Sequence, residues 1–402
     1  MKWPMVKLEE LATHIRNGVS VKQSPNAGGL KITRIETIAE RKVNLNKCGY
    51  ADLTENDYMD FRLKKGDILI SHINSESHLG KCAIFEEERN DIVHGMNLLS
   101  FRTNRKVEPK YLYYALSSDS FLMKLKKITK KSVNQASFNV TSFKELDIPL
   151  PPLEEQKRIA AILDKADAIR QKRQQAITLA DQFLRSVFLD MFGDPVTNPK
   201  EWDIYPLKKG ITNITAGWSA NGENHSCGDD EIGVLKISAV TSGIFKPNEN
   251  KVVSSSSIPS NKKLVLPRKG DLLFSRANTR ELVGATCIVD SDYDNIFLPD
   301  KLWVINLNSN ELLPEYVHML IQHPKFKECL TSQATGSSGS MLNISKAKFE
   351  GTLAPYPSLD VQQRFKDIFW KVMTCNALTN DSKINFDNQF NALSQKAFSG
   401  QL

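Results

Sequence analysis

The chain contains one unit of roughly 200 residues twice, and this internal repeat constrains its fold more than any other feature. Residues 62–88 resemble residues 266–292, with Lys-Gly-Asp before a short apolar run in both. Further matches follow in the same order, at shifts of 204 to 206 residues. A period this long excludes a solenoid, whose repeats span about 20–50 residues. The sequence therefore predicts a pseudo-twofold molecule with two homologous domains, each followed by a helical part.

Four more blocks carry the repeat and define its parts. The matched blocks are 108–116 with 313–321, 137–146 with 341–350 at a shift of 204, 148–159 with 354–365, and the region near 188–195 with the C-terminal residues. In both copies a globular part precedes a helical part. The predicted segments are a first globular domain at 1–150, a central helical spacer at 151–193, a second globular domain at 194–355 and a C-terminal helical spacer at 356–402.

The globular parts combine strand and helix patterns. Short apolar runs at 66–71 and 270–275 begin at the Lys-Gly-Asp turn, where glycine supplies a permissive backbone. Segments 109–128 and 314–330 each begin with a proline near the first helical position, which indicates helices. We therefore expect the α+β class, with a mostly antiparallel, twisted sheet in each globular domain.

A proline-rich connector at 149–152 precedes the clearest helix, at 153–192. Forty residues at about 1.5 Å each give a helix of about 60 Å. Apolar residues recur at alternating spacings of three and four, with Arg173 in the stripe, which is typical of a coiled-coil seam. We expect this helix and the one in 356–402 to pack as an antiparallel coiled coil that separates the globular domains; in the alternative, each helix packs on its own domain. The seam residues are Ile162, Ala166, Ile169, Ala176, Ala180, Phe183 and Val187, and then Ile368, Val372, Cys375, Leu378, Phe386, Phe390 and Leu393.

Composition and charge narrow the class of protein. Apolar residues make up 41% and charged residues 25%, which excludes a disordered or collagen-like chain. The net charge of +7 is compatible with nucleic-acid binding without being diagnostic. Residues 1–150 hold 24 basic and 18 acidic residues, whereas residues 194–355 hold 17 and 18, so the positive excess lies in the first domain.

The lack of a visible targeting signal and the spacing of the cysteines together predict a cytoplasmic location. No apolar run approaches the roughly 18 residues of a membrane span, and the first residues lack the apolar core of a secretory signal. The six cysteines lie at least 34 residues apart without a Cys-x-x-Cys pair, as expected of thiols in a reducing compartment. We expect no membrane partner.

Catalytic signatures are missing from the sequence. It contains no Walker A motif, no His-Glu-x-x-His and no Gly-x-Ser-x-Gly. Its seven histidines occur singly, without metal-ligand spacing, and no glycine-rich loop follows a strand as a dinucleotide or S-adenosylmethionine site requires. The sequence therefore favours a binding module over an enzyme, with neither metal nor cofactor bound by this chain.

Several of these segments together resemble the specificity subunit of Type I restriction–modification enzymes. They are the Pro-Leu-Pro-Pro-Leu-Glu-Glu-Gln-Lys-Arg stretch at 149–158 before the long helix, the two Lys-Gly-Asp segments, the 187–195 region and the C-terminal residues 392–402. The resemblance covers essentially the whole chain. The second copy departs from it at 356–365, where one proline and the Glu-Glu pair are missing, which puts an equally tight helix pairing or partner contact on that side in doubt.

The resemblance implies a non-catalytic subunit that gives a larger complex its DNA specificity. Each globular domain would be a target-recognition domain that reads one half of a bipartite site in double-stranded DNA. The helices would set the unread spacer and dock two methyltransferase subunits, which use S-adenosylmethionine to methylate adenine. Restriction and translocase subunits, using ATP and magnesium, would be further partners.

Candidate DNA contacts follow from side-chain chemistry, because bases are read by hydrogen-bonding side chains on loops and phosphates are bound by Lys, Arg and hydroxyl groups. The polar loops after the two apolar runs correspond between the copies, as do the loops at 130–137 and 335–341. The first copy supplies Lys22, Lys31, Arg34, His72, Asn74, Ser75, His94, Asn97, Lys130, Lys131, Asn134 and Gln135. The second supplies Trp218, Lys236, Ser275, Arg276, Asn278, Thr279, Asp300, Lys301, Ser337 and Ser338.

Two other classes of protein stay open at this point. A self-contained nuclease or methyltransferase would cut or methylate DNA as a purified chain. A structural coiled-coil adaptor would show no salt-dependent binding to duplex DNA in the presence of a methyltransferase, since phosphate contacts release counterions.

Overall fold

The computed structural model describes residues 3–24, 28–132, 135–332, 334–335 and 342–402, and only the backbone of helical residues 377–386. The chain forms two compact units. Unit 1 contains Met1–Gln175 and Asn380–Leu402, and unit 2 contains Ala176–Thr379. Each unit contains part of both long helices. The segments predicted from the sequence instead separate the helices from the globular domains. The two divisions use different criteria, so the predicted boundaries are not tested by this one.

The strands are short, as expected of chains interrupted by turns every few residues. In unit 1 they are β1 (Met5–Lys7), β2 (Ala12–Asn17), β3 (Gln23–Ser24), β4 (Leu30–Ile32), β5 (Gly49–Ala51), β6 (Ile68–Ser71), β7 (Ile73–Asn74), β8 (Cys82–Ile84), β9 (Ile92–Val93), β10 (Leu98–Thr103), β11 (Lys130–Lys131), β12 (Ala136–Ser137) and β13 (Asp147–Pro149). In unit 2 they are β14 (Ile204–Pro206), β15 (Ile211–Ala216), β16 (Ile232–Leu235), β17 (Asn250–Val253), β18 (Leu272–Ser275), β19 (Ala277–Asn278), β20 (Thr286–Ile288), β21 (Ile296–Phe297), β22 (Leu302–Leu307), β23 (Leu342–Asn343) and β24 (Leu353–Pro355).

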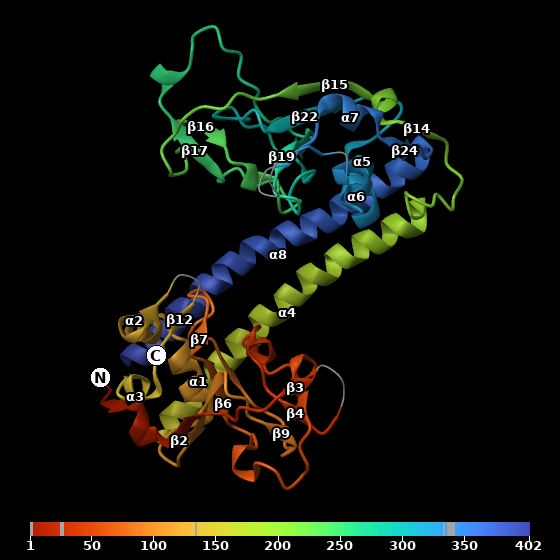
Figure 1. The fold of residues 1–402 in the computed structure, drawn as a ribbon. Helices are drawn as coiled ribbons and strands as arrows, with labels where there is room; N and C mark the ends of the chain where they lie inside the picture. Colours follow the sequence, from red (N-terminus) through yellow and green to blue (C-terminus); the bar gives the residue numbers. More distant parts are fainter. Residues whose placement is uncertain (1–2, 25–27, 133–134, 333, 336–341) are drawn as a thin grey trace. The chain divides into compact units, whose positions relative to one another are not determined.

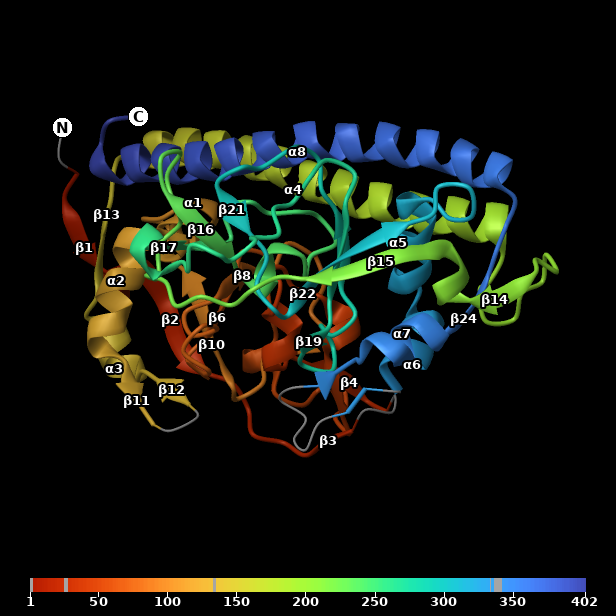
Figure 2. The ribbon, with the colours of Figure 1, turned by 90° about the horizontal axis from the view of Figure 1, so that it is seen from above.

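Corresponding sheets occur in both units, although two of them have one strand more in unit 1. The main antiparallel sheet has the order β2-β10-β6-β8 in unit 1 and β15-β22-β18-β20 in unit 2. A second sheet contains one parallel pair in each unit, β4 with β9 and β16 with β21. Two-stranded pairs close each domain, β1 with β13 and β14 with β24 (Figure 2). The α+β class and the two similar domains are confirmed.

The repeated Lys-Gly-Asp turn has a physical reason. Gly66 and Gly270 both adopt positive φ angles, 93° and 87°, which glycine accepts without strain. The carboxylate of the following aspartate accepts a hydrogen bond from a backbone amide three residues earlier. Asp67 Oδ2 accepts a hydrogen bond from the Lys64 amide at 2.8 Å, and Asp271 Oδ2 accepts one from the Arg268 amide at the same distance. The turn directs the chain into the central strands β6 and β18, which are fully buried.

Short helices cover the main sheets. The predicted helices at 109–128 and 314–330 are each broken into two. In unit 1, Ser118 ends the first of these helices and caps the next one by accepting a hydrogen bond from the Phe121 amide at 3.3 Å. In unit 2, Pro324 is the first residue of the second helix. The α-helices are α1 (Pro109–Ser117), α2 (Asp119–Ile128), α3 (Val140–Lys144), α5 (Pro314–Gln322), α6 (Pro324–Ser332) and α7 (Lys346–Gly351). The 3-10 helices are η1 (Leu8–Leu11), η2 (Ile35–Ile38), η3 (Leu45–Lys47), η4 (Met59–Phe61), η5 (Leu207–Gly210), η6 (Ile237–Ala239) and η7 (Ser255–Ser257).

Two long helices, α4 (Leu153–Phe192) and α8 (Leu359–Ser399), follow the globular parts (Figure 1). Within unit 1 the Arg158 guanidinium donates to the Leu402 carbonyl at 2.9 Å, and the Arg170 guanidinium lies 4.8 Å from the centre of the Phe390 ring. In unit 2 the Phe192 and Phe365 rings lie 5.3 Å apart. Within unit 1, increasing numbers along α4 meet decreasing numbers along α8, so the two segments are antiparallel there.

The buried face of α4 is displaced by one residue from the predicted seam, so the prediction of the seam is wrong. Ile169 and Phe183 are exposed by 43% and 52%, whereas Leu163, Leu184 and Phe188 are buried. Leu163 belongs to the main core of unit 1, and Leu184 and Phe188 to that of unit 2. Packing on the globular domains, the alternative expected from the sequence, therefore decides which face of the helix is buried. Throughout the described part of the chain, no helix is long and apolar enough to cross a membrane.

Candidate nucleic-acid interface

In unit 1, strand pairing brings the two predicted polar loops together. Strand β12 pairs with β7, with Ala136 opposite Asn74 and Ser137 opposite Ile73. The Asn74 amide nitrogen donates to Ser71 Oγ at 3.2 Å, and its oxygen accepts from the Ser75 amide at 2.8 Å. These contacts fix the start of the loop, while Ser75 stays exposed.

Unit 2 repeats this arrangement around Arg276. Strand β19 pairs with β23, with Ala277 opposite Asn343 and Asn278 opposite Leu342. Arg276 Nε donates to the Asp300 carbonyl at 2.9 Å, its Nη2 lies 3.3 Å from Asp300 Oδ2, and its Nη1 donates to Asn343 Oδ1 at 3.5 Å. The half-buried guanidinium is therefore held in one orientation at the end of β18.

The strand pairs correct one detail of the repeat. The sequence alignment places Asn139 opposite Asn343, at a shift of 204. In the structure Asn139 caps α3 and Ser345 caps α7, so these two residues are equivalent and the shift is 206. Phe143 and Phe349 then correspond as well, and both are fully buried. Strand pairing settles this register where short, diverged sequences do not.

Several predicted contacts lie on the surface of unit 1. Lys130 and Lys131 form the exposed strand β11, and Lys131 Nζ lies 2.7 Å from Glu76 Oε1. Gln135 is exposed in the turn that follows. Asn134, Ser337 and Ser338 lie outside the described residues, so their predicted role stays a prediction.

Three predicted contacts are corrected because their side chains are buried. His72, His94 and Ser275 are exposed by 3%, 1% and 0% and cannot reach a duplex in this conformation. His94 Nε2 lies 2.9 Å from the Leu98 carbonyl oxygen, and burial lowers the pKa of its imidazole to about 4. Its counterpart in the second copy is Leu298, as both residues bond the same equivalent backbone groups. His94 therefore occupies a core position.

The remaining candidates are exposed or half-buried. In unit 1, Lys22 and Asn97 are exposed, Lys31 is half-buried on β4, and Arg34 Nε donates to Gln23 Oε1 at 2.6 Å. In unit 2, Trp218 stacks on Phe297 with ring centres 6.0 Å apart. The half-buried residues of unit 2 are Lys236, Asn278, Thr279, Asp300 and Lys301.

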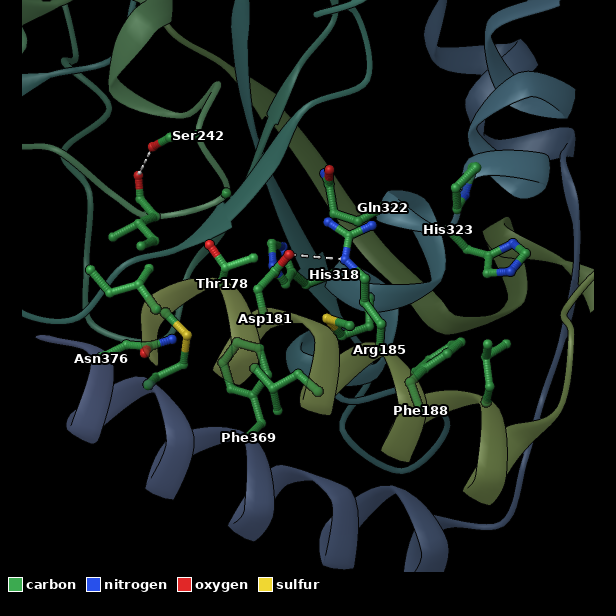
Figure 3. A pocket seen from close by; sticks show the side chains of 18 residues that line it. Thr178, Asp181, Arg185, Phe188, Ser242, His318, Gln322, His323, Phe369 and Asn376 are labelled. Atoms are coloured by element: carbon green, nitrogen blue, oxygen red, sulfur yellow. Dashed lines mark hydrogen bonds and ion pairs between the residues drawn. The ribbon is translucent and has the colours of Figure 1, made fainter. Parts of the chain in front are cut away.

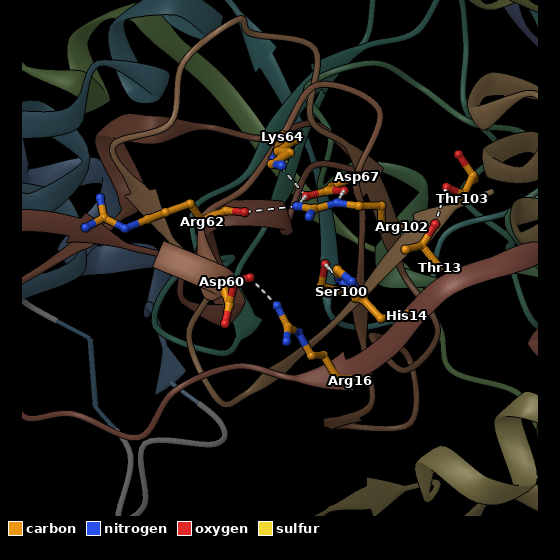
Figure 4. A network of polar contacts seen from close by, with 10 residues as sticks. All are labelled: Thr13, His14, Arg16, Asp60, Arg62, Lys64, Asp67, Ser100, Arg102 and Thr103. Carbon is orange, nitrogen blue, oxygen red and sulfur yellow. Dashed lines mark hydrogen bonds and ion pairs between the residues drawn. The ribbon is translucent and has the colours of Figure 1, made fainter. Parts of the chain in front are cut away.

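Part of the basic excess of the first domain is used inside the fold (Figure 4). Arg102 pairs with the buried Asp67 through two hydrogen bonds, at 2.7 and 2.8 Å. Arg62, exposed by only 5%, donates to the carbonyl oxygens of residues 54, 55 and 57. Arg16 donates to the Asp60 carbonyl, with its guanidinium 4.2 Å from the Phe61 ring centre. The count of basic residues therefore overstates the number of positive side chains that this domain has available for phosphate contacts.

The chemistry of the two loop pairs is that of recognition. Among the described residues, no group of three or more His, Cys, Asp or Glu side chains could hold a metal ion. Amide, hydroxyl and guanidinium groups on the paired loops can donate to base edges and phosphates.

Comparison with known proteins shows what this chain resembles. Residues 1–179 match the model described as "Type I restriction modification DNA specificity domain". The chain is 41% identical over 219 residues to a Methanocaldococcus jannaschii protein named as the MjaX specificity subunit of a type I restriction enzyme, a match that covers 51% of this chain and 52% of that protein. It is 22% identical to the EcoKI specificity subunit of Escherichia coli K12, over 100% of this chain and 89% of that one. The chain is therefore similar to specificity subunits of type I restriction enzymes.

The fold also agrees with that of a solved structure. The crystal structure of the S subunit of a Type I restriction–modification system from M. genitalium covers 99% of this chain and 96% of its own, with a TM-score of 0.62 at 14% identity. The matched regions span about half of the MjaX subunit and 28% of the EcoEI specificity subunit of Escherichia coli.

Two residues at these loops were not predicted from the sequence. Asn343 holds one Arg276 nitrogen, and Lys262 Nζ lies 5.7 Å from the centre of the Trp218 ring. Asn343 lies beside Arg276 because β23 pairs with β19, and this strand pairing has no signal in the sequence. Lys262 lies in a segment with no strong pattern, and no sequence signal indicates it.

Proposed function

We propose that this chain is the DNA-specificity subunit of a Type I restriction–modification complex. Each globular domain reads one half of a bipartite DNA site. The carrying observation is that equivalent strand pairs, β7 with β12 and β19 with β23, bring the same two polar loops together in both units. Two readers with one scaffold and different side chains suit two different half-site sequences.

The helices supply the second part of the proposal. α4 is 40 residues long, about 60 Å at 1.5 Å per residue, and connects the two readers in the chain. We propose that α4 and α8 set the length of the unread spacer and dock two methyltransferase subunits. Restriction and translocase subunits complete the complex in the cytoplasm.

The chain itself is proposed to be non-catalytic and to bind no cofactor. S-adenosylmethionine would be bound by the methyltransferase subunits, and ATP and Mg²⁺ by the motor and nuclease subunits. The supporting observation is the absence of the common catalytic motifs from the sequence.

Methylome sequencing of host cells with and without this gene tests the proposal. We expect one bipartite adenine-methylation motif to disappear with the gene. The purified complex with its methyltransferase should bind that sequence with a steep salt dependence, whereas the chain alone should neither methylate nor cut DNA. An unchanged methylome, or catalysis by the chain alone, would overturn the proposal.

A further inference from the structure

Unit 2 contains a cavity of about 580 Å³ that the proposed DNA interface does not use. Its walls come from the C-terminal half of α4, from α5, from the first half of α8 and from the loop at 242–244 (Figure 3). Close-packed protein interiors leave few voids larger than a water molecule. Sites for small organic molecules measure about 300–1,000 Å³, so this cavity has the size of such a site.

The deep part of the cavity is apolar and aromatic. Phe188 and Phe369 are exposed by only 2% each, and Met319 by 8%. Met373 adds a second thioether to the wall. Aromatic rings and flexible methionines together adapt to flat apolar molecules of varied outline.

A small number of polar groups converge on the same cavity. Arg185 Nε lies 3.1 Å from Asp181 Oδ2, with the Arg185 side chain 51% exposed at the cavity wall. Gln322 donates to Thr286 Oγ1 at 2.9 Å, which fixes its amide. His323 Nδ1 is buried and has no hydrogen-bond partner within the described part of the chain. Such groups orient a ligand whose body lies on the apolar wall.

The repeat shows that this apolar cavity is not required by the fold. A cavity of about 440 Å³ in unit 1 overlaps the equivalent place only in part, at the start of α2 and on α8, and is lined mainly by serine, asparagine and glutamine side chains. Tyr113 stands there where unit 2 has His318, and Arg41 stands where unit 2 has Gly243. Tyr113 donates to the Arg41 carbonyl at 3.4 Å, and Arg41 and Gly243 share positive φ angles of 58° and 81°. Smaller residues leave unit 2 with the larger space.

We propose that this cavity binds a small amphipathic molecule with an aromatic or alicyclic body and an anionic group. The body packs against Phe188, Phe369 and Met319, and the anionic group accepts hydrogen bonds from Arg185. A single side chain inserted from a partner protein would leave most of this volume empty, which favours a whole small molecule. The bound molecule contacts three helices of unit 2, so binding stabilises that unit by mass action.

This site is separate from the proposed DNA function, because none of its walls belongs to the paired polar loops. The test therefore uses the full chain in its methyltransferase complex and the probe 1-anilinonaphthalene-8-sulfonate, an aromatic anion of the proposed class. We expect saturable binding at one site, with increased fluorescence and a raised melting temperature of the complex.

Variants of the cavity wall test the location of the probe. Gly243→Arg introduces the residue that unit 1 has at this position and should weaken binding at least about tenfold by filling the cavity. Met319→Phe is the second filling variant, in case the first disturbs folding. Arg185→Gln should weaken binding several-fold while N-phenyl-1-naphthylamine, the uncharged analogue of the probe, binds as before.

Asn391→Tyr, which alters the unit 1 cavity at an exposed residue, is the matched control and should leave probe affinity unchanged. Specific methylation should be preserved in all these variants. The proposal is overturned if both filling variants fold and bind the probe as tightly as the original chain, or if the control alone abolishes binding.

Discussion

Gln156 and Gln362 make the same three hydrogen bonds in the two copies of the repeat. The Gln156 amide oxygen accepts from the Glu108 amide at 2.8 Å, and its nitrogen donates to the carbonyls of Lys106 and Pro151 at 3.1 and 2.9 Å. Gln362 bonds in the same way to residues 313, 311 and 357, at 2.8, 3.0 and 2.8 Å. Both side chains are fully buried, so each fastens the first turn of a long helix to the loop before a short one.

Replacing either glutamine should destabilise its own unit. Gln156→Leu leaves one amide and two carbonyl groups without partners, at a cost of about 2–4 kcal/mol in the free energy of unfolding. Gln362→Leu should cost a similar amount in unit 2. Denaturant unfolding measures both, with the exposed Gln363→Leu as control; a change below about 0.5 kcal/mol for the buried glutamines would contradict the structural role.

The buried ion pair of unit 1 should matter more than its counterpart. Arg102→Met leaves the Asp67 carboxylate buried without its guanidinium, and the expected loss of stability is about 2–3 kcal/mol. At the equivalent place in unit 2 the residue is Asn306, which is exposed, and Asn306→Met should change stability by less than about 0.5 kcal/mol. Thermal unfolding measures both variants. Equal losses of stability for Arg102→Met and Asn306→Met would contradict a stabilising role for the ion pair.

Acid should destabilise unit 1 partly through His94. Burial lowers the pKa of its imidazole to about 4, against 6.5 in the unfolded chain, so its contribution is complete above pH 6.5 and is lost as the pH falls toward 4. His94→Leu, the residue of the second copy, should reduce the loss of stability between pH 7 and pH 5 by about 2 kcal/mol. Denaturant unfolding at both pH values measures this. An unchanged pH dependence would show that His94 is not the titrating group.

Arg276→Ala should weaken reading of one half-site. The guanidinium is held by Asp300 and Asn343, so its loss removes an ordered donor and should cost about 1–3 kcal/mol in specific binding. The complex should still assemble. Methylation rates on half-site variants measure the effect, with Arg268→Ala, at the distant turn, as control. Methylation of the same sequence at an unchanged rate would remove this loop from the interface.

Shortening the central helix should change the accepted spacer. Deleting one heptad between residues 160 and 190 of α4 removes about 10 Å of helix, the length of about three base pairs. Residues 170–176 are suited to this deletion, because Leu163, Leu184 and Phe188 anchor the two ends in their cores. Methylome sequencing of cells with the deletion reports the spacer. An unchanged spacer would contradict the ruler role of the helices.

Local patterns predicted the elements well where one signal dominated. The sequence indicated the long helix at 153–192, and α4 has these bounds, because the proline-rich connector and Gly193 stop it on both sides. The apolar runs after Lys-Gly-Asp are β6 and β18. Both are buried on all sides in the main sheets, so their hydrophobicity alone reveals them.

The sequence predicted less well what depends on contacts between distant residues. The seam on α4 was placed one residue away because the helix carries two adjacent apolar stripes, and only packing on the cores selects Leu163 and Phe188. His72 looked like a loop donor, yet Phe138, which follows strand β12 and lies 66 residues later, covers it with ring centres 6.3 Å apart. Local polarity cannot reveal such burial.

The offset between the two stripes of α4 has a practical consequence. Leu179 and Phe183 are four residues apart on one helix face and are exposed by 61% and 52%. The chain by itself therefore presents two adjacent apolar side chains to water. A subunit produced by itself is therefore expected to be poorly soluble and to self-associate. Co-production with the proposed methyltransferase partner is therefore the route we expect to give material for the measurements above.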